Sequence, residues 1–170
     1  GNLNDSSGND RTGAHSGTNL QENLSSTGKF GTGLYLDGTG EHISITGYKG
    51  ITGGAARSMT AWIKTDKNQA PIRNWGNNAA GQKWTFRTQT DNGVSGAIRV
   101  EVNGGSIVGD TKVDDNHWYH VAAVMSGTNL NTMVLYVDGL AVGNSSGPSN
   151  RVVASASGND VRIGKDHSSR

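Results

Sequence analysis

Apolar and polar residues alternate along much of this chain, and the clearest alternation lies between residues 114 and 143. Side chains from 118 to 125, and again from 133 to 138, follow the period of two residues that is typical of strands with a buried face. Asp138-Gly139 then turns the chain. Both central residues of a type I′ turn need positive φ, which this pair tolerates, so the sequence predicts a tight hairpin end here.

Other alternating runs predict the remaining strands. Two strands are expected over 29–36 and 43–45, joined by a turn over 37–40. A Ser/Gly/Pro loop is expected over 144–150. Further strands are expected over 58–64, 71–76, 82–87, 96–105, 106–109, 151–156 and 160–164.

The same alternation assigns side chains to faces. Arg99 and Glu101 share one side of their strand, so that side of the sheet is expected to face water. Trp62 and Trp118 each belong to an alternating set within a strand, and we expect both rings to be core anchors. Replacing Trp118 with alanine should then cost about 3–5 kcal/mol and prevent soluble expression.

Composition favours an all-β protein with a single domain spanning residues 1–170. The chain contains 26 glycines and 2 prolines, and only 32% of its residues are hydrophobic. Such a composition suits many short strands joined by polar turns, and no window of helical periodicity exceeds about two turns. A length of 170 residues fits one domain with a sizeable core.

Charge and cysteine content exclude several classes of partner. The formal net charge is +1 and the basic residues are scattered, which argues against nucleic acid and anionic membranes as partners. The absence of cysteine excludes disulfides and thiolate metal sites. No apolar run approaches the ~20 residues of a membrane span, and the polar start is no signal peptide. If the protein is secreted, we expect its signal to lie outside this sequence.

Several segments together resemble a known family. They are Lys29-Phe30-Gly31, the strand centred on Ala61-Trp62-Ile63, the order Asp115-x-x-Trp118, and Leu135-Tyr136-Val137-Asp138-Gly139. In this order they resemble the bacterial laminin-G-like domains of the concanavalin A-like lectin/glucanase superfamily, from Asp5 to Gly164. The resemblance implies an antiparallel two-sheet jelly-roll sandwich. The family's first and last strands have no counterpart here, so we expect either that the sequence is trimmed at these strands or that another chain or strand covers the exposed edges.

The superfamily contains both glycosidases and non-catalytic lectin-like modules, and the carboxylates distinguish them. The resemblance implies that catalytic members carry their two carboxylates on one strand, as Glu-x-Asp-x-x-Glu or a near variant. The only glutamates here are Glu22, Glu41 and Glu101, and none of them lies in that arrangement. Asp114 and Asp115 are adjacent and would point to opposite faces of a strand. Catalysis is therefore not expected.

Two histidines could suggest a metal site or a catalytic base. His117 and His120 have neither a cysteine nor a serine elbow beside them, and His120 alternates with Trp118. We interpret His120 as a half-buried strand residue with satisfied hydrogen bonds.

Two hypotheses of function follow. The first is a carbohydrate-binding or lectin-like accessory module of a larger secreted bacterial protein, which would place it outside the cell or on its surface. The alternative is a structural or protein-adhesion module without sugar binding. The expected partners are a polysaccharide or glycan, or another extracellular protein.

A sugar site needs exposed aromatic rings beside amides and carboxylates. The candidate rings are Tyr48, Trp75 and Tyr119, and glycine- and asparagine-rich loops over 75–82 and 48–54 favour a ligand surface. The expected sugar-facing patch consists of Trp75, Asn77, Asn78, Gln82 and Arg87. The alternative is that Trp75 packs beneath its own loop.

A bound Ca²⁺ is a further expectation, because relatives commonly carry one. Its ligands would be Asp37 with backbone oxygens of its turn, and Asp5 or Asn9 from an oxygen-rich loop. Those residue types also form ordinary Asx and Ser turns.

Overall fold

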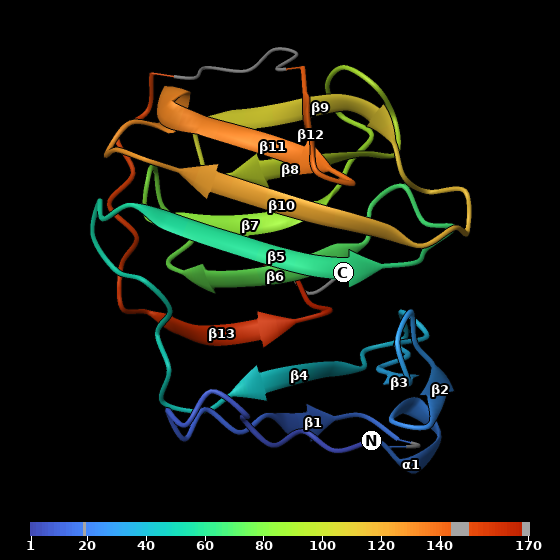
Figure 1. Cartoon of the computed structure of the whole chain (residues 1–170). Helices are drawn as coiled ribbons and strands as arrows, with labels where there is room; N and C mark the ends of the chain where they lie inside the picture. The colour runs from blue at the N-terminus through green and yellow to red at the C-terminus, as the bar shows by residue number, and fades with distance from the viewer. Residues whose placement is uncertain (19, 144–149, 168–170) are drawn as a thin grey trace.

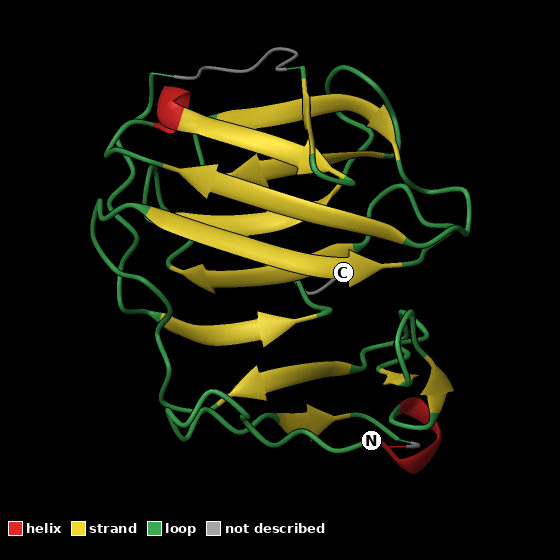
Figure 2. Cartoon of the chain, viewed as in Figure 1, coloured by secondary structure: helices red, strands yellow, loops and turns green. Residues whose placement is uncertain are grey.

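The protein is described by a computed structural model that covers residues 1–18, 20–143 and 150–167. Strands make up almost all of its regular structure (Figure 2). The larger sheet contains, in spatial order, β1 (Ala14–Ser16), β4 (His42–Ile45), β13 (Asn159–Ile163), β6 (Pro71–Gly76), β7 (Lys83–Thr88), β8 (Ala97–Glu101) and β9 (Ser106–Lys112). The smaller sheet contains β12 (Leu140–Val142), β11 (Met133–Val137), β10 (Tyr119–Met125) and β5 (Arg57–Ile63).

The two sheets form two layers. In Figure 1 the smaller sheet lies in front of β6 to β9, and β13, β4 and β1 continue the larger sheet beyond it. Every strand pairing is antiparallel, which confirms the expected all-β antiparallel sandwich. The remaining elements are a short hairpin of β2 (Ser26–Thr27) and β3 (Thr32–Gly33), the helix α1 (Leu20–Asn23) and the 3₁₀ turn η1 (Leu130–Thr132).

Alternation along the strands builds the core between the layers. Trp84 and Phe86 point inward from β7, Val121 and Ala123 point inward from β10, and all four are fully buried. This arrangement removes large apolar side chains of both sheets from water, which is the main favourable term in folding.

The hairpin end at residue 138 is confirmed. Asp138 has a φ of 50° and Gly139 a φ of 82°, as a type I′ turn requires, and they connect β11 to β12. The preceding connection between β10 and β11 contains η1, and its strands pair from Val121↔Val137 to Met125↔Met133.

Two expectations about strands are wrong. Residues 29–36 do not pair with 43–45, because β3 ends at Gly33 and pairs with β2, while β4 pairs with β1 and β13. Residues 151–156 form isolated bridges rather than a strand. The loop expected over 144–150 lies, except for Asn150, outside the described residues.

The outer side of the larger sheet also differs from expectation. The side of β8 that carries Arg99 and Glu101 was expected to face water, yet Arg99 is only 8% exposed. Arg87 of β7 is equally buried on the same side. The outer face of β7 and β8 is therefore a largely buried layer of charged groups.

Candidate functional site

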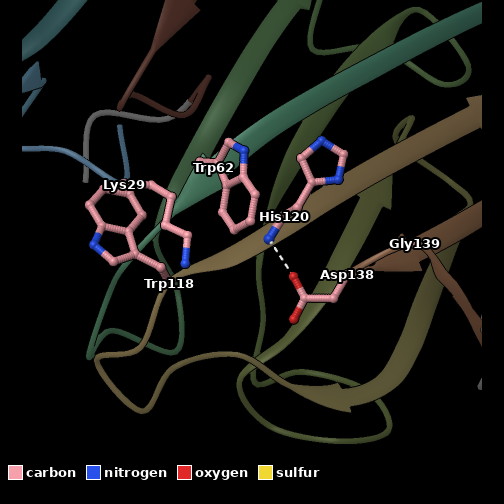
Figure 3. A pocket seen from close by; sticks show the side chains of 6 residues that line it. All are labelled: Lys29, Trp62, Trp118, His120, Asp138 and Gly139. Carbon is pink, nitrogen blue, oxygen red and sulfur yellow. Dashed lines mark hydrogen bonds between the residues drawn. The ribbon is translucent and has the colours of Figure 1, made fainter. Parts of the chain in front are cut away.

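The outer face of the smaller sheet carries an aromatic cavity. It has a volume of about 510 Å³ and is lined by side chains from β5, from β10 and its approach, from the β11–β12 turn and from the β2–β3 hairpin (Figure 3). We call it the aromatic cleft, and its lining residues are Lys29, Trp62, Trp118, His120, Asp138 and Gly139.

Trp62 faces this cleft because of its position in β5. Met59 is buried, and Ala61 and Ile63 pack against the core, so odd-numbered residues point inward. The side chain of Trp62 must then point outward, and it is 40% exposed. His120 of β10 lies directly opposite Trp62 in the register, which places both rings on the same outer face.

The neighbours of Trp62 orient its ring. Phe30, itself 73% exposed, meets it edge to face with ring centroids 5.7 Å apart and an interplanar angle of 84°. The His120 ring lies 5.3 Å away, and the ammonium of Lys29 lies 5.1 Å from the centroid of the indole. Edge-to-face and cation–π geometries of this kind are attractive, so the exposed indole is supported from several sides.

Asp138 is fixed at the rim of the cleft by reciprocal hydrogen bonds. Its backbone N–H donates to the carbonyl of His120 at 2.8 Å, and its Oδ1 accepts the backbone N–H of His120 at 2.8 Å. The carboxylate therefore has a defined position beside the Trp62–His120 pair, as Figure 3 shows. Aromatic faces, an ammonium and a carboxylate together can contact both the C–H faces and the hydroxyls of a sugar.

The cleft corrects the expectations for the tryptophans. Trp62 is exposed and Trp118 lines the cavity half-buried, so the prediction that both are core anchors is wrong. His120 is half-buried as expected, and His117 is exposed beside Asp115. Alternation with Met59, Ala61 and Ile63 was the signal that could have placed Trp62 outside.

The rings expected to be exposed are instead packed. Tyr48 and Tyr119 are half-buried against the core, and Trp75 is only 4% exposed. The Trp75 indole stacks on Trp84 with centroids 5.4 Å apart, and its Nε1–H donates to the carbonyl of Ile51 at 3.1 Å. This burial contradicts the stacking role proposed for Trp75 and favours the alternative in which it packs beneath a loop.

The polar members of the expected patch separate into two places. Asn77 and Asn78 are exposed, and Asn77 Nδ2 donates weakly to Gln82 Oε1 at 3.4 Å. Asn78 Oδ1 accepts from Asn103 at 3.2 Å. Arg87 lies on the outer face of β7, where it pairs with carboxylates, so it does not belong to that loop surface.

The expected calcium ligands are engaged in their own turns. Asp5 accepts the backbone N–H groups of Ser7 and Arg11 at 2.8 and 2.9 Å. Hydrogen bonding to the Ser7 side chain, followed by these two backbone bonds, lowers the pKa of Asp5 to about 2. Asp37 accepts the N–H of Thr39 at 2.6 Å, and Asn9 bonds to Ser7. No three His, Cys, Asp or Glu side chains of the described residues gather as a metal site. Calcium binding by Asp37 and backbone oxygens of its turn, with Asp5 or Asn9, stays a prediction.

Asp91 and Glu101 lie close enough to share one arginine, which raises the question of whether they could act as a hydrolytic dyad. Asp91 and Glu101 both contact the guanidinium of Arg87, at 2.6 and 3.4 Å. The hydrogen bond from Arg87 lowers the pKa of Asp91. Burial raises the pKa of Glu101, but Lys83, Arg99 and Arg87 together outweigh it and leave that pKa lowered as well. A general acid needs a raised pKa, so this pair does not supply one.

Comparisons with known proteins agree with the fold. Residues 37–170 match the family described as the concanavalin A-like lectin/glucanases superfamily. Domain 4 of AbnA, a GH43 extracellular arabinanase from Geobacillus stearothermophilus solved in complex with arabinotriose, superposes with a TM-score of 0.67 at 19% identity, covering 96% of this chain and 78% of that one. A search of curated sequences finds no match.

A second solved structure is more distant. Domains LG4-5 of the mouse laminin alpha1 chain superpose with a TM-score of 0.50 at 12% identity, over 76% of this chain. The match spans about a third of that laminin structure, 32% of its length. Identities this low show that the fold is shared, but they do not show that a ligand is shared.

Among the described residues, no helix is long and apolar enough to cross a membrane.

Proposed function

Because the chain belongs to the concanavalin A-like lectin/glucanases superfamily, we propose that it is a non-catalytic carbohydrate-binding module whose sugar site is the aromatic cleft. The observation that carries the proposal is the exposed indole of Trp62 in a cavity shared with Trp118. We propose further that it serves as an accessory part of a larger extracellular protein. The arabinanase domain, which was solved in complex with arabinotriose, supports a sugar ligand for this fold.

The chemistry of the cleft suits a sugar ring. An indole face stacks on the C–H groups of a pyranose or furanose, because these groups are apolar and weakly positive. The Lys29 ammonium donates hydrogen bonds, and the Asp138 carboxylate accepts them, so hydroxyls at the edge of the ring find partners of both kinds. The cavity of about 510 Å³ has room for one or two sugar units.

Leaving Trp62 exposed is energetically unfavourable without a ligand. A tryptophan at 40% exposure keeps a large apolar area in water, and Phe30 beside it is 73% exposed. Contiguous exposed aromatic residues commonly mark binding surfaces. A polypeptide could also cover such a surface, and this is the protein-adhesion alternative.

Affinity electrophoresis against a panel of plant and marine polysaccharides, arabinan included, tests the proposal. Trp62→Ala and Trp118→Ala should each weaken retention by at least about 1 kcal/mol, or roughly fivefold. Tyr35→Ala is the matched control, because Tyr35 is a 57% exposed ring that does not line the cleft. Thermal midpoints verify that each variant is folded.

Two outcomes would contradict the proposal. If Asn77→Ala abolishes retention while Trp62→Ala leaves it unchanged, the site lies at the 75–82 loop instead. If the folded wild-type protein is retained by no polysaccharide in the panel, the protein-adhesion alternative is favoured.

A further inference from the structure

A second candidate site lies on the outer face of the larger sheet, turned away from the viewer in Figure 1. Directly paired residues of neighbouring strands point to the same side of a sheet. The register pairs Arg162 of β13 with Asn74 of β6, Asn74 with Thr85 of β7, and Thr85 with Glu101 of β8. Lys83, Arg87 and Arg99 share this side through the same alternation. We call this set of seven residues the guanidinium face.

Most cations of the guanidinium face are neutralised by two carboxylates. Glu101 pairs with Lys83, and it contacts Arg99 at 3.0 Å and Arg87 at 3.4 Å. Asp91 bridges the same two arginines, at 2.6 Å from Arg87 and 3.2 Å from Arg99. Three cations therefore share two carboxylates, which leaves this part of the face with a net positive charge.

Arg162 adds a fourth cation that contacts no carboxylate of the described residues, although its charge adds to the hydrogen bond from Lys49 in lowering the pKa of Asp160. Among the described residues it forms no ion pair within 4.0 Å, and its Nε and Nη2 are inaccessible to solvent without a hydrogen-bond partner. Oδ1 of Asn74, its cross-strand neighbour, is likewise buried and unpaired. The Nε atoms of Arg87 and Arg99, two side chains about nine-tenths buried, also lack partners. Burying charged donors without acceptors is costly, so the face is arranged for an anionic partner.

The chain's own residues 165–167 lie across this face. The carbonyl of Lys165 accepts a hydrogen bond from Asn74 Nδ2, and the Asp166 carboxylate lies 3.5 Å from the hydroxyl of Thr85. His167 Nε2 lies 3.0 Å from the carbonyl of Trp75. Asp166 Oδ1 also accepts the backbone N–H of His167 at 2.6 Å, a bond within its own segment. Its contact with the face itself is the one to Thr85, which at 3.5 Å is longer than a good O–H···O bond, so the carboxylate is held on the face only weakly.

We propose that the guanidinium face binds the carboxylate group of an acidic sugar, which replaces Asp166 on Thr85 and pairs with Arg162. Guanidinium groups match a planar carboxylate with two parallel N–H donors, and Asp166 already shows that a carboxylate fits here. This site is on the opposite side of the molecule from the aromatic cleft and does not depend on it. That the carboxylate belongs to a sugar rests on the proposed function, and the ligand class is then uronic acid-containing oligosaccharides.

Titration calorimetry with trigalacturonate, in parallel with neutral arabinotriose, tests this assignment at constant ionic strength. The wild-type protein should bind trigalacturonate with a dissociation constant that Arg162→Gln raises at least tenfold. Asp166→Asn should lower it severalfold, because the competing resident carboxylate is removed. Lys67→Gln is the matched control and should change nothing, since Lys67 is an exposed cation with a side chain 72% accessible.

The controls also separate this site from the aromatic cleft. Trp62→Ala should leave trigalacturonate binding unchanged even where it abolishes binding of a neutral glycan. Equal dissociation constants for wild type and Asp166→Asn would overturn the proposal, and that variant keeps it testable if Arg162→Gln fails to fold. Loss of trigalacturonate binding in Trp62→Ala would overturn the proposal as well. So would sodium sulfate that competes for the site as strongly as trigalacturonate binds to it.

Discussion

Arg57 anchors the loop that covers Trp75, and replacing it with lysine should destabilise the fold. Arg57 is 4% exposed, and its guanidinium lies 5.0 Å from the centroid of the fully buried Trp84 ring. It donates to the carbonyls of Ala55, Ile51 and Gly53 at 3.0, 2.8 and 2.7 Å, and to Ser155 Oγ at 2.8 Å. Among the described residues no carboxylate pairs with it, and burial lowers its pKa to about 10.

The expected magnitude follows from those four hydrogen bonds. A lysine ammonium keeps the charge and the cation–π contact, but its compact head cannot reach acceptors arranged around a planar fork. We expect it to lose at least two of the four bonds, each worth about 1.5 kcal/mol because the donor is charged. Arg57→Lys should therefore lower the free energy of unfolding by about 3 kcal/mol.

Urea denaturation followed by tryptophan fluorescence measures this loss, because Trp84 and Trp75 lie beside the affected loop. Ile51 accepts from both Arg57 and Trp75, so the emission of the native state should also shift toward that of an exposed indole. Arg151→Lys is the matched control: Arg151 is exposed, and among the described residues its side chain forms one hydrogen bond, 3.2 Å long, to the carbonyl of Gly104. A loss below about 1 kcal/mol for Arg57→Lys, or one equal to the control, would refute the reasoning.

Two further predictions concern pH and calcium. The folded-state pKa of Glu101 is lowered, so its contribution to stability is complete above the ordinary value of 4.5 and is lost as pH falls through the folded value. In urea melts, Glu101→Gln should be less stable than the wild type at pH 7 and should lose less stability than the wild type between pH 5 and pH 3. Parallel curves of stability against pH for the two proteins would show that Glu101 does not cause the loss of stability in acid. If Ca²⁺ binds near Asp37 and Asp5, saturating Ca²⁺ at about 100 times its dissociation constant should add about 2.7 kcal/mol, or roughly 5–10 °C in melting temperature, and equal midpoints in Ca²⁺ and EDTA would exclude the site.

Local signals in the sequence predict the fold where the partners are near in the chain. The Asp138-Gly139 pair needs only its own positive φ values, and the expected turn is present. The turn at Asp37 is also real, since Asp37 accepts the N–H of Thr39, but it does not join two paired strands. The true partner of β4 on one side is β13, more than 100 residues later, and no local pattern specifies that pairing.

The burial of Trp75 could not be predicted from its own loop. A glycine- and asparagine-rich neighbourhood is common to exposed binding loops and to loops that cover a ring closely. The decisive contact comes from Gly50, whose φ is +72° and where an added Cβ would lie 2.6 Å from the Trp75 ring. Only a glycine backbone can approach the indole that closely. The loop over 51–55 is held there by Arg57, which begins β5, whereas Trp75 belongs to β6.

Both candidate sites combine segments that are distant in sequence, for the same physical reason. A sandwich presents two outer faces, and each face collects every second residue from strands whose spatial order differs from their chain order. The aromatic cleft joins Lys29 to Trp62 and Asp138, and the guanidinium face joins Asn74 to Arg99 and Arg162. Neither set forms a contiguous motif. Alternation predicts which side each residue faces, but the neighbours across that face depend on sheet order, which long-range pairing decides.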